Sequence, residues 1–117
     1  MKKILVFDDE EAIRMLYELE LSEEGYDVIT SGEAFRCMEL IREHSPNVVV
    51  MDKRMGNHDG ADVLREIRGQ FPALPLILCT AYPSHGSQKG DMVADFYADK
   101  SSDLKDLKLK IKAVVEI

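Results

Sequence analysis

The chain has 117 residues, of which 45% are hydrophobic and 32% are charged, and its formal net charge is -7. We therefore expect residues 1–117 to form one globular domain of ordinary composition, with no separate output domain. The acidic balance argues against direct binding of nucleic acid, which requires a basic surface.

No apolar stretch reaches the length of a membrane span. The amino terminus opens with Lys2 and Lys3, but the apolar stretch after them ends at Asp8, which is too short for a signal peptide. Cys37 and Cys79 lie far apart and outside any CxxC spacing, so we expect buried free thiols in a reducing compartment. These features predict a soluble, cytoplasmic protein without membrane contact.

Strand-like and helix-like segments alternate along the whole chain. Short aliphatic runs without polar alternation predict buried parallel strands, and apolar residues three or four positions apart predict helices. The expected strands cover residues 3–7, 26–30, 47–51, 75–79 and 95–98. The expected helices cover residues 10–24, 33–44 and 61–69, with a short one within 83–90 and a last one from about residue 103. Such alternation predicts a doubly wound parallel sheet of the α/β class, in which ligands bind at the carboxyl ends of the strands.

Side chains that can bind ions or take part in reactions follow the ends of these strands. Asp8 and Asp9 follow the first strand, and Asp52 follows the third. Three carboxylates at one edge of a sheet repel one another unless a cation lies among them, and a hard divalent cation with oxygen ligands fits best. Thr80 and Lys100 follow the fourth and fifth strands, so we expect them at the same edge.

In this order, the residues resemble the response-regulator receiver domains of two-component phosphotransfer, of the stand-alone type. The resemblance covers essentially the whole chain and implies a flavodoxin-like (βα)5 fold with strand order 2-1-3-4-5. It rests on four segments, namely residues 3–10, residues 48–52 with Met55 and Asp59-Gly60, residues 79–81, and residues 96–100.

The resemblance implies that Asp52 is a phosphoryl acceptor. It would attack the phosphorus of a phosphohistidine presented by a sensor histidine kinase or a phosphotransfer protein. It further implies that Mg²⁺, or Mn²⁺, is held by Asp9, Asp52 and the backbone carbonyl of Arg54, with Asp8 holding metal-bound water. The cation would screen the carboxylates from the incoming phosphoryl group.

The resemblance also assigns the remaining residues of the pocket. Lys100 and Thr80 would each contact a phosphoryl oxygen, and the small Ala81 would leave the approach to Asp52 open. Tyr97 would be the aromatic switch, turning inward when Thr80 moves towards the phosphoryl group. The face formed by the fourth helix, fifth strand and fifth helix would then regulate an effector protein. Such a domain is a monomer or a weak phosphorylation-dependent dimer, and it catalyses only its own phosphorylation and dephosphorylation.

Other functions remain open for this pattern. The domain could be a phosphorelay intermediate, or a pseudo-receiver that acts by protein binding only. A Mg²⁺-dependent phosphohydrolase with an aspartyl phosphate would need a second Asp two residues after the nucleophile, where Arg54 stands. A flavin module would need a phosphate-binding loop rich in Gly, Ser and Thr after the first strand, where residues 8–10 are acidic.

The chain departs from the family pattern near the pocket. Gly56 replaces the usual proline, which predicts a looser loop after Asp52, and His58 replaces an apolar residue. Ser101 follows Lys100 where the family has a proline after a cis bond. A cis bond before a residue other than proline costs about 3 kcal/mol, so we expect a trans bond here.

Two further features affect how the pocket works and where partners bind. Lys53 and Arg54 directly follow the acceptor, so either cation could contact the phosphoryl group. The first helix is more apolar than one buried face requires, since it carries Met15, Leu16, Tyr17, Leu19 and Leu21. Either a partner docks on that helix or the helix packs tightly against the domain.

Overall fold

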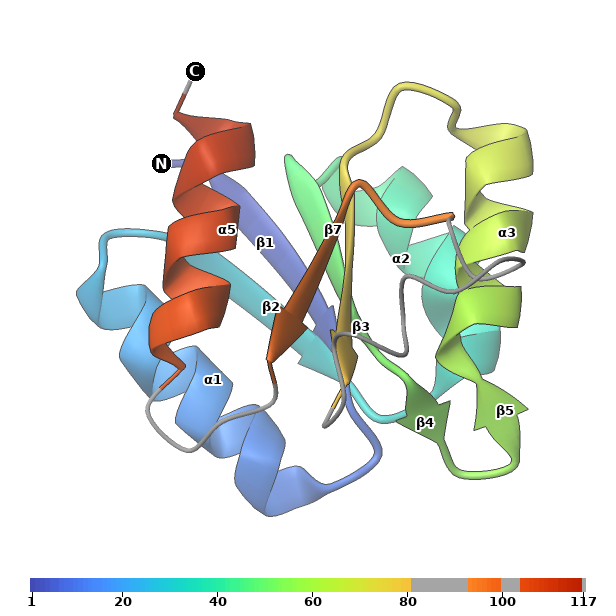
Figure 1. Cartoon of the computed structure of the whole chain (residues 1–117), viewed down its shortest axis with the longest axis horizontal. Helices are drawn as coiled ribbons and strands as arrows, with labels where there is room; N and C mark the ends of the chain where they lie inside the picture. Colours follow the sequence, from blue (N-terminus) through green and yellow to red (C-terminus); the bar gives the residue numbers. More distant parts are fainter. Residues whose placement is uncertain (81–92, 100–103, 117) are drawn as a thin grey trace.

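The structure, a computed structural model, describes residues 1–80, 93–99 and 104–116. Five parallel strands form one sheet, and their order across it is β2 (Asp27–Ser31), β1 (Lys3–Phe7), β3 (Val48–Asp52), β6 (Leu76–Thr80) and β7 (Phe96–Asp99). The described helices are α1 (Glu11–Glu23), the 3-10 turn η1 (Ala34–Arg36), α2 (Cys37–His44), α3 (Gly60–Gln70) and α5 (Lys105–Val115). The predicted order 2-1-3-4-5 is confirmed, because β6 and β7 are the fourth and fifth strands of this sheet (Figure 1).

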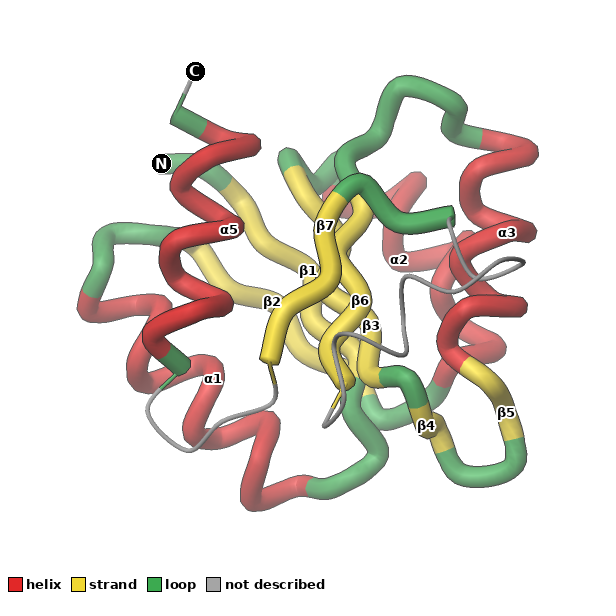
Figure 2. The backbone as a smooth tube through the Cα atoms, in the orientation of Figure 1, coloured by secondary structure: helices red, strands yellow, loops and turns green. Residues whose placement is uncertain are grey.

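The central strands are buried on both faces of the sheet. Side chains of β1 and β3 alternate between two core clusters, so that Leu5 and Val49 pack with α2 and α3 while Val6 and Val50 pack with α1 and α5. Figure 2 shows the same division, with α1 and α5 on one side of the strands and α2 and α3 on the other. Full coverage explains why these strands are continuous apolar runs, the pattern from which they were predicted.

The segment after β3 was predicted to be a loose loop, but the structure is more ordered. It contains a short antiparallel hairpin, made of β4 (Arg54–Met55) and β5 (His58–Asp59). Gly56 lies in the turn with a φ of +60°, a left-handed conformation that glycine adopts readily and proline cannot adopt. Gly56 in place of proline therefore permits a hairpin here.

The start of α3 lies directly against the end of β3. The side chain of Asp59 caps the helix by accepting a hydrogen bond of 2.8 Å from the Ala61 amide. The next residue, Gly60, leaves no space for a side chain, because a Cβ atom there would lie 2.0 Å from the carbonyl oxygen of Asp52. The pair Asp59-Gly60 therefore fixes α3 beneath the predicted acceptor.

The remaining differences from the predicted elements are small. The helix expected over residues 33–44 begins as the 3-10 turn and becomes α-helical at Cys37. The buried free thiols expected at Cys37 and Cys79 are confirmed. The expected fourth helix within residues 83–90 and the Lys100–Ser101 bond lie outside the described residues.

The first helix uses part of its apolar surface for packing and leaves part exposed. Tyr17 and Leu21 are buried, whereas Met15 is 65% exposed and Leu19 is 58% exposed. Tight packing therefore accounts for only some of the apolar residues of α1. Within the part of the chain that the structure describes, no helix has the length and apolar character needed to cross a membrane.

We predict that Gly60→Ala destabilises the domain by roughly 1–3 kcal/mol or more, because the added methyl group must displace the backbone of Asp52. Gly69→Ala is the matched control, since Gly69 lies in the same helix and a Cβ atom there meets nothing within 4 Å. That control should be neutral or stabilise the domain by up to about 1 kcal/mol. Urea unfolding measures both free energies, and equal values for the two variants would contradict the close approach at Gly60.

Candidate functional site

Three of the predicted site residues, Asp8, Asp52 and Thr80, lie at the carboxyl edge of the sheet. Phe7 pairs with Met51 across β1 and β3, so Asp8 and Asp52 follow neighbouring positions of adjacent parallel strands. Asp52 pairs in turn with Cys79 on β6, which places Thr80 at the same edge. Lys100 and Ala81 lie outside the described residues, although Lys100 directly follows the last residue of β7.

Three polar side chains of this edge are buried. Asp8 is 0% exposed, Asp52 is 4% exposed and Thr80 is 7% exposed. Because burying a carboxylate costs free energy unless it is hydrogen-bonded or paired with a cation, packing alone does not account for the two buried aspartates. Asp8 Oδ1 accepts a hydrogen bond of 2.9 Å from the Glu10 amide, two residues along the chain.

Asp8 and Asp9 do not serve as an ordinary helix cap. The residue at the N-cap of α1 is Glu10, and its side chain makes no capping hydrogen bond. Arg14 instead donates a 2.8 Å hydrogen bond to the Asp8 carbonyl and so fixes the turn between β1 and α1. The exposed carboxylate of Asp9 accepts a hydrogen bond of 2.9 Å from the Gly56 amide in the hairpin turn.

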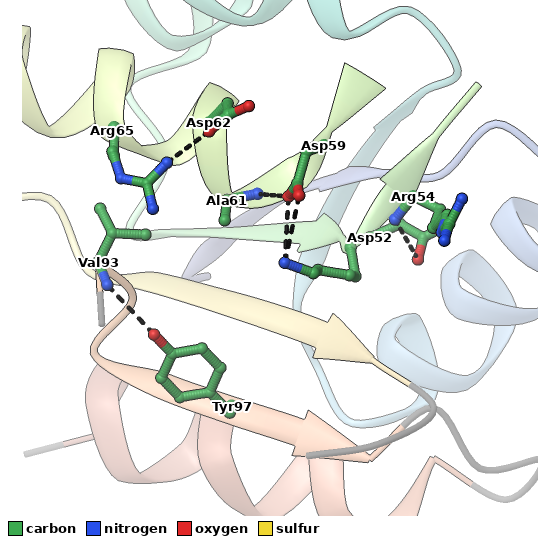
Figure 3. Close-up of polar contacts among 9 residues, drawn as sticks. Asp52, Arg54, Asp59, Ala61, Asp62, Arg65, Val93 and Tyr97 are labelled. Carbon is green, nitrogen blue, oxygen red and sulfur yellow. Dashed lines mark hydrogen bonds and ion pairs between the residues drawn. The ribbon is translucent and has the colours of Figure 1, made fainter. Parts of the chain in front are cut away.

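The hairpin contacts Asp52 as well. The Arg54 amide donates a long hydrogen bond of 3.4 Å to Asp52 Oδ1, while the Arg54 side chain is exposed (Figure 3). The Lys53 ammonium lies 3.2 Å from an Asp59 oxygen, so its charge is directed to the base of α3. Of the two cations that follow the acceptor, Arg54 is therefore the one whose side chain is open to solvent.

Tyr97 lies on β7 beside the core between the sheet and α2 and α3. Its hydroxyl accepts a hydrogen bond of 3.1 Å from the Val93 amide (Figure 3). The Val93 carbonyl accepts from Arg68, which also forms an ion pair of 2.8 Å with Asp95. Tyr97, the predicted switch residue, is only partly buried. Its hydroxyl is hydrogen-bonded to the segment that leads into β7.

The comparison with known families agrees with this geometry. The family model of the response regulator receiver domain matches residues 4–112. The chain belongs to this family.

Solved structures of other receiver domains share the fold over nearly all of this one. The response regulator TrrA from Thermotoga maritima, in complex with Mg²⁺-BeF, is 36% identical with a TM-score of 0.89, and the match covers 97% of this chain and 99% of TrrA. A structure of the histidine kinase ThkA in complex with TrrA gives 36% identity and a TM-score of 0.89 over 98% of this chain and 99% of that one. NtrX from Brucella abortus is 28% identical with a TM-score of 0.86, and the match covers 99% of this chain but 27% of NtrX.

The acidic residues of this receiver domain suit a hard divalent cation. Among the described residues, Asp8, Asp9 and Glu10 offer carboxylate oxygens that all lie within 4.8 Å of one another. Only oxygen donors are present in this group, the ligand type that Mg²⁺ prefers. Glu10 was not among the predicted ligands, although its place directly after two aspartates was a visible signal. Asp52 is not part of this group of three.

Sequence reasoning also missed Tyr17, which lies buried beneath the pocket. Burial raises the pKa of its phenol well above the ordinary value, and the neighbouring Cys79 side chain and the charges of Asp8 and Asp52 raise it further. The phenol is therefore held in its neutral form below two carboxylates. An isolated tyrosine on the apolar face of a helix has no sequence signal that separates it from a core residue.

The end of β7 is fixed by α5. The Asp99 amide donates a hydrogen bond of 2.8 Å to Asp106, whose pKa is lowered by its hydrogen bond with Lys110 and by this same contact. Asp106 therefore stays ionised and anchors the residue that precedes Lys100. This contact fixes the last described residue of β7 to α5.

We predict that Tyr17→Phe flattens the loss of stability at alkaline pH. The folded pKa of Tyr17 lies above the unfolded value of about 10, so the phenol of the unfolded chain ionises first and stability falls as pH rises beyond that value. The fall reaches about 1.4 kcal/mol per pH unit for one such group. Urea unfolding between about pH 9 and 11 measures the slope in both proteins.

Tyr26→Phe is the positive control for this measurement. Burial, and then the hydrogen bond with Glu116, raise the pKa of Tyr26 to about 12, so its removal should flatten the slope in the same direction. A Tyr17→Phe slope identical to that of the parent, beside a flattened Tyr26→Phe slope, would contradict the neutral buried phenol.

Proposed function

We propose that this receiver domain accepts a phosphoryl group on Asp52 in a Mg²⁺-dependent reaction and passes the change to a partner protein. The observation that supports this most directly is the burial of Asp8, Asp52 and Thr80 at the one edge where β1, β3 and β6 end. A buried acidic pair beside a hydroxyl has no packing benefit, but it suits the binding of a cation and a phosphoryl group together.

In this proposal Asp52 is the nucleophile. One of its carboxylate oxygens forms a bond to phosphorus while the P–N bond of a donor phosphohistidine breaks, and the electron pair of that bond stays on the imidazole nitrogen. Asp8 and Asp9 with Asp52 and the Arg54 carbonyl would hold Mg²⁺, or Mn²⁺. The cation, when bound, supplies positive charge that stabilises the phosphoryl oxygens.

Thr80 and Lys100 would hold the phosphoryl oxygens after transfer. Thr80 is buried at the edge and presents a hydroxyl, and Lys100 follows the anchored end of β7. Movement of Thr80 would open space for the ring of Tyr97, which is the proposed switch on the face that includes β7 and α5. Such a local change of charge acting on a two-state element is how phosphorylation switches operate.

The same proposal implies particular binding partners and a cellular location. The complex of ThkA with TrrA supports a sensor histidine kinase, or a phosphotransfer protein, as the donor. In NtrX the matched unit is about a quarter of the chain, which supports an effector as the recipient of the signal. We propose that residues 1–117 act as one receiver domain in the cytoplasm. The domain would be a phosphoacceptor rather than an enzyme with turnover.

The first test is phosphorylation by a small phosphodonor such as acetyl phosphate with Mg²⁺, followed by intact mass. The parent protein should gain a stoichiometric phosphoryl group, and chelation of the metal should prevent the gain. Asp52→Asn should gain none, because the nucleophile is gone. Asp62→Asn is the matched control, since Asp62 is an exposed aspartate on α3, and it should react as the parent does. Equal modification of Asp52→Asn and the parent, or continuous release of phosphate without a stable phosphoprotein, would refute the proposal.

A second prediction concerns the lifetime of the phosphorylated form. The exposed guanidinium of Arg54 follows the acceptor closely, so it can shield the phosphoryl oxygens from water. We expect Arg54→Ala to shorten the lifetime about two- to fivefold, the effect of one solvent-exposed charge interaction. Arg65→Ala is the control, because Arg65 is also exposed but pairs with Asp62 on α3. Decay measured by intact mass at the same rate in all three proteins would contradict a role for Arg54.

A further inference from the structure

The backbone of the β4–β5 hairpin contacts two carboxylates, one that follows β1 and one that ends β3. The Gly56 amide donates a 2.9 Å hydrogen bond to Asp9 Oδ2, across 47 residues of sequence. Two residues earlier, the Arg54 amide approaches Asp52 Oδ1 at 3.4 Å. One short turn therefore contacts both Asp9, which follows β1, and Asp52, which ends β3.

The bond to Asp9 places two requirements on residue 56. The residue must have a backbone N–H, and it must adopt the φ of +60° that closes the turn. Glycine meets both requirements, whereas proline has no N–H and a φ fixed near -65°. Space is not the reason for glycine here, because a Cβ atom would meet nothing within 4 Å. The identity of residue 56 thus decides whether this contact exists.

Asp9 needs such a contact more than its neighbours do. Asp8 and Asp52 are buried and therefore confined by packing, but Asp9 is exposed, so packing does not confine its carboxylate. Fixing an exposed side chain for metal binding costs conformational entropy. A hydrogen bond to one carboxylate oxygen reduces that cost and leaves the other oxygen available as a ligand, as in the outer contacts that orient metal-binding carboxylates.

We propose that Gly56 is a positioning residue of the Mg²⁺ site, and that its amide makes the β4–β5 hairpin an outer part of that site. This inference rests on the proposed function, since it requires Asp9 to bind the cation. Binding and hairpin order are then linked in both directions. The hairpin holds Asp9 for the metal, and the metal in turn stabilises the hydrogen-bonded hairpin.

The first experiment compares the Mg²⁺ affinity of variants at residue 56, with the metal alone as probe. Stepwise addition of MgCl₂ is followed by amide NMR at constant ionic strength. Gly56→Asn keeps the N–H and tolerates a positive φ, so it should bind within about twofold of the parent. Gly56→Pro loses both properties and should bind roughly tenfold more weakly, the lower end for outer contacts of a metal site.

The second experiment uses the parent protein, so that it decides the matter even if Gly56→Pro fails to fold. Hydrogen exchange of the Gly56 amide should slow on addition of Mg²⁺ by roughly the same tenfold factor, because the coupling is reciprocal. The Gly25 amide is the matched control. Gly25 also has a positive φ, of +94°, and its amide donates a 3.0 Å hydrogen bond to Ser22 at the far end of α1. Its exchange should not respond to the metal.

The outcomes separate the two proposals. If the parent binds Mg²⁺ while exchange at Gly56 is unchanged, or while Gly56→Pro binds equally well, the role of Gly56 is refuted and the proposed function stands. If the parent binds no Mg²⁺ at all, both are refuted. Slower exchange confined to Gly56 and its hairpin, with weaker binding in Gly56→Pro alone, supports the positioning role.

Discussion

The structure depends on holding carboxylates close together at the carboxyl edge of a parallel sheet. Asp8 and Asp52 follow neighbouring positions on β1 and β3, and both are nearly inaccessible to solvent. Their mutual repulsion and lost hydration oppose folding, so the rest of the domain must offset that cost. Backbone amides supply part of the compensation, from Glu10 to Asp8 and from Arg54 to Asp52. The larger part comes from burial of the apolar strands themselves, which helices cover on both faces.

Two glycines allow the backbone to close around this edge, each for a different physical reason. Gly60 is required by space, since the first turn of α3 contacts the Asp52 carbonyl where any side chain would collide. Gly56 is required by conformation, since it closes the hairpin with a positive φ. Together they bring α3 and the hairpin against the acceptor from the same loop. The segment between β3 and α3 therefore serves both the pocket, through these two glycines, and the core, into which its Met55 packs.

The parts of the fold that follow from burial could be predicted from the sequence. Buried strands such as β1 and β3 are runs of four or five apolar residues, and their ends at Asp8 and Asp52 marked the edge of the sheet. The hairpin could not be predicted in this way, because its strands have two residues each and those of β5 are exposed. Tyr17 was missed for a related reason: its contact with the pocket depends on the tertiary approach of α1, and its sequence neighbours give no sign of it.

The contacts of Tyr97 are suited in magnitude to the switch that we propose. Turning the ring away from its present position breaks one hydrogen bond, from the Val93 amide, which costs about 0.5–1.5 kcal/mol if water replaces the hydroxyl. The Val93 carbonyl keeps its contact with Arg68, which is also held by Asp95, so the segment before β7 does not have to unfold when the ring moves. A hydrogen-bond cost of this size can be offset by one or two contacts between Thr80 and a phosphoryl group. Turning a buried and fully packed aromatic ring would cost several times more free energy. A fully exposed ring would contact too little of the domain to transmit a change. The half-buried position of Tyr97 lies between these limits, which favours a state that a local charge can shift.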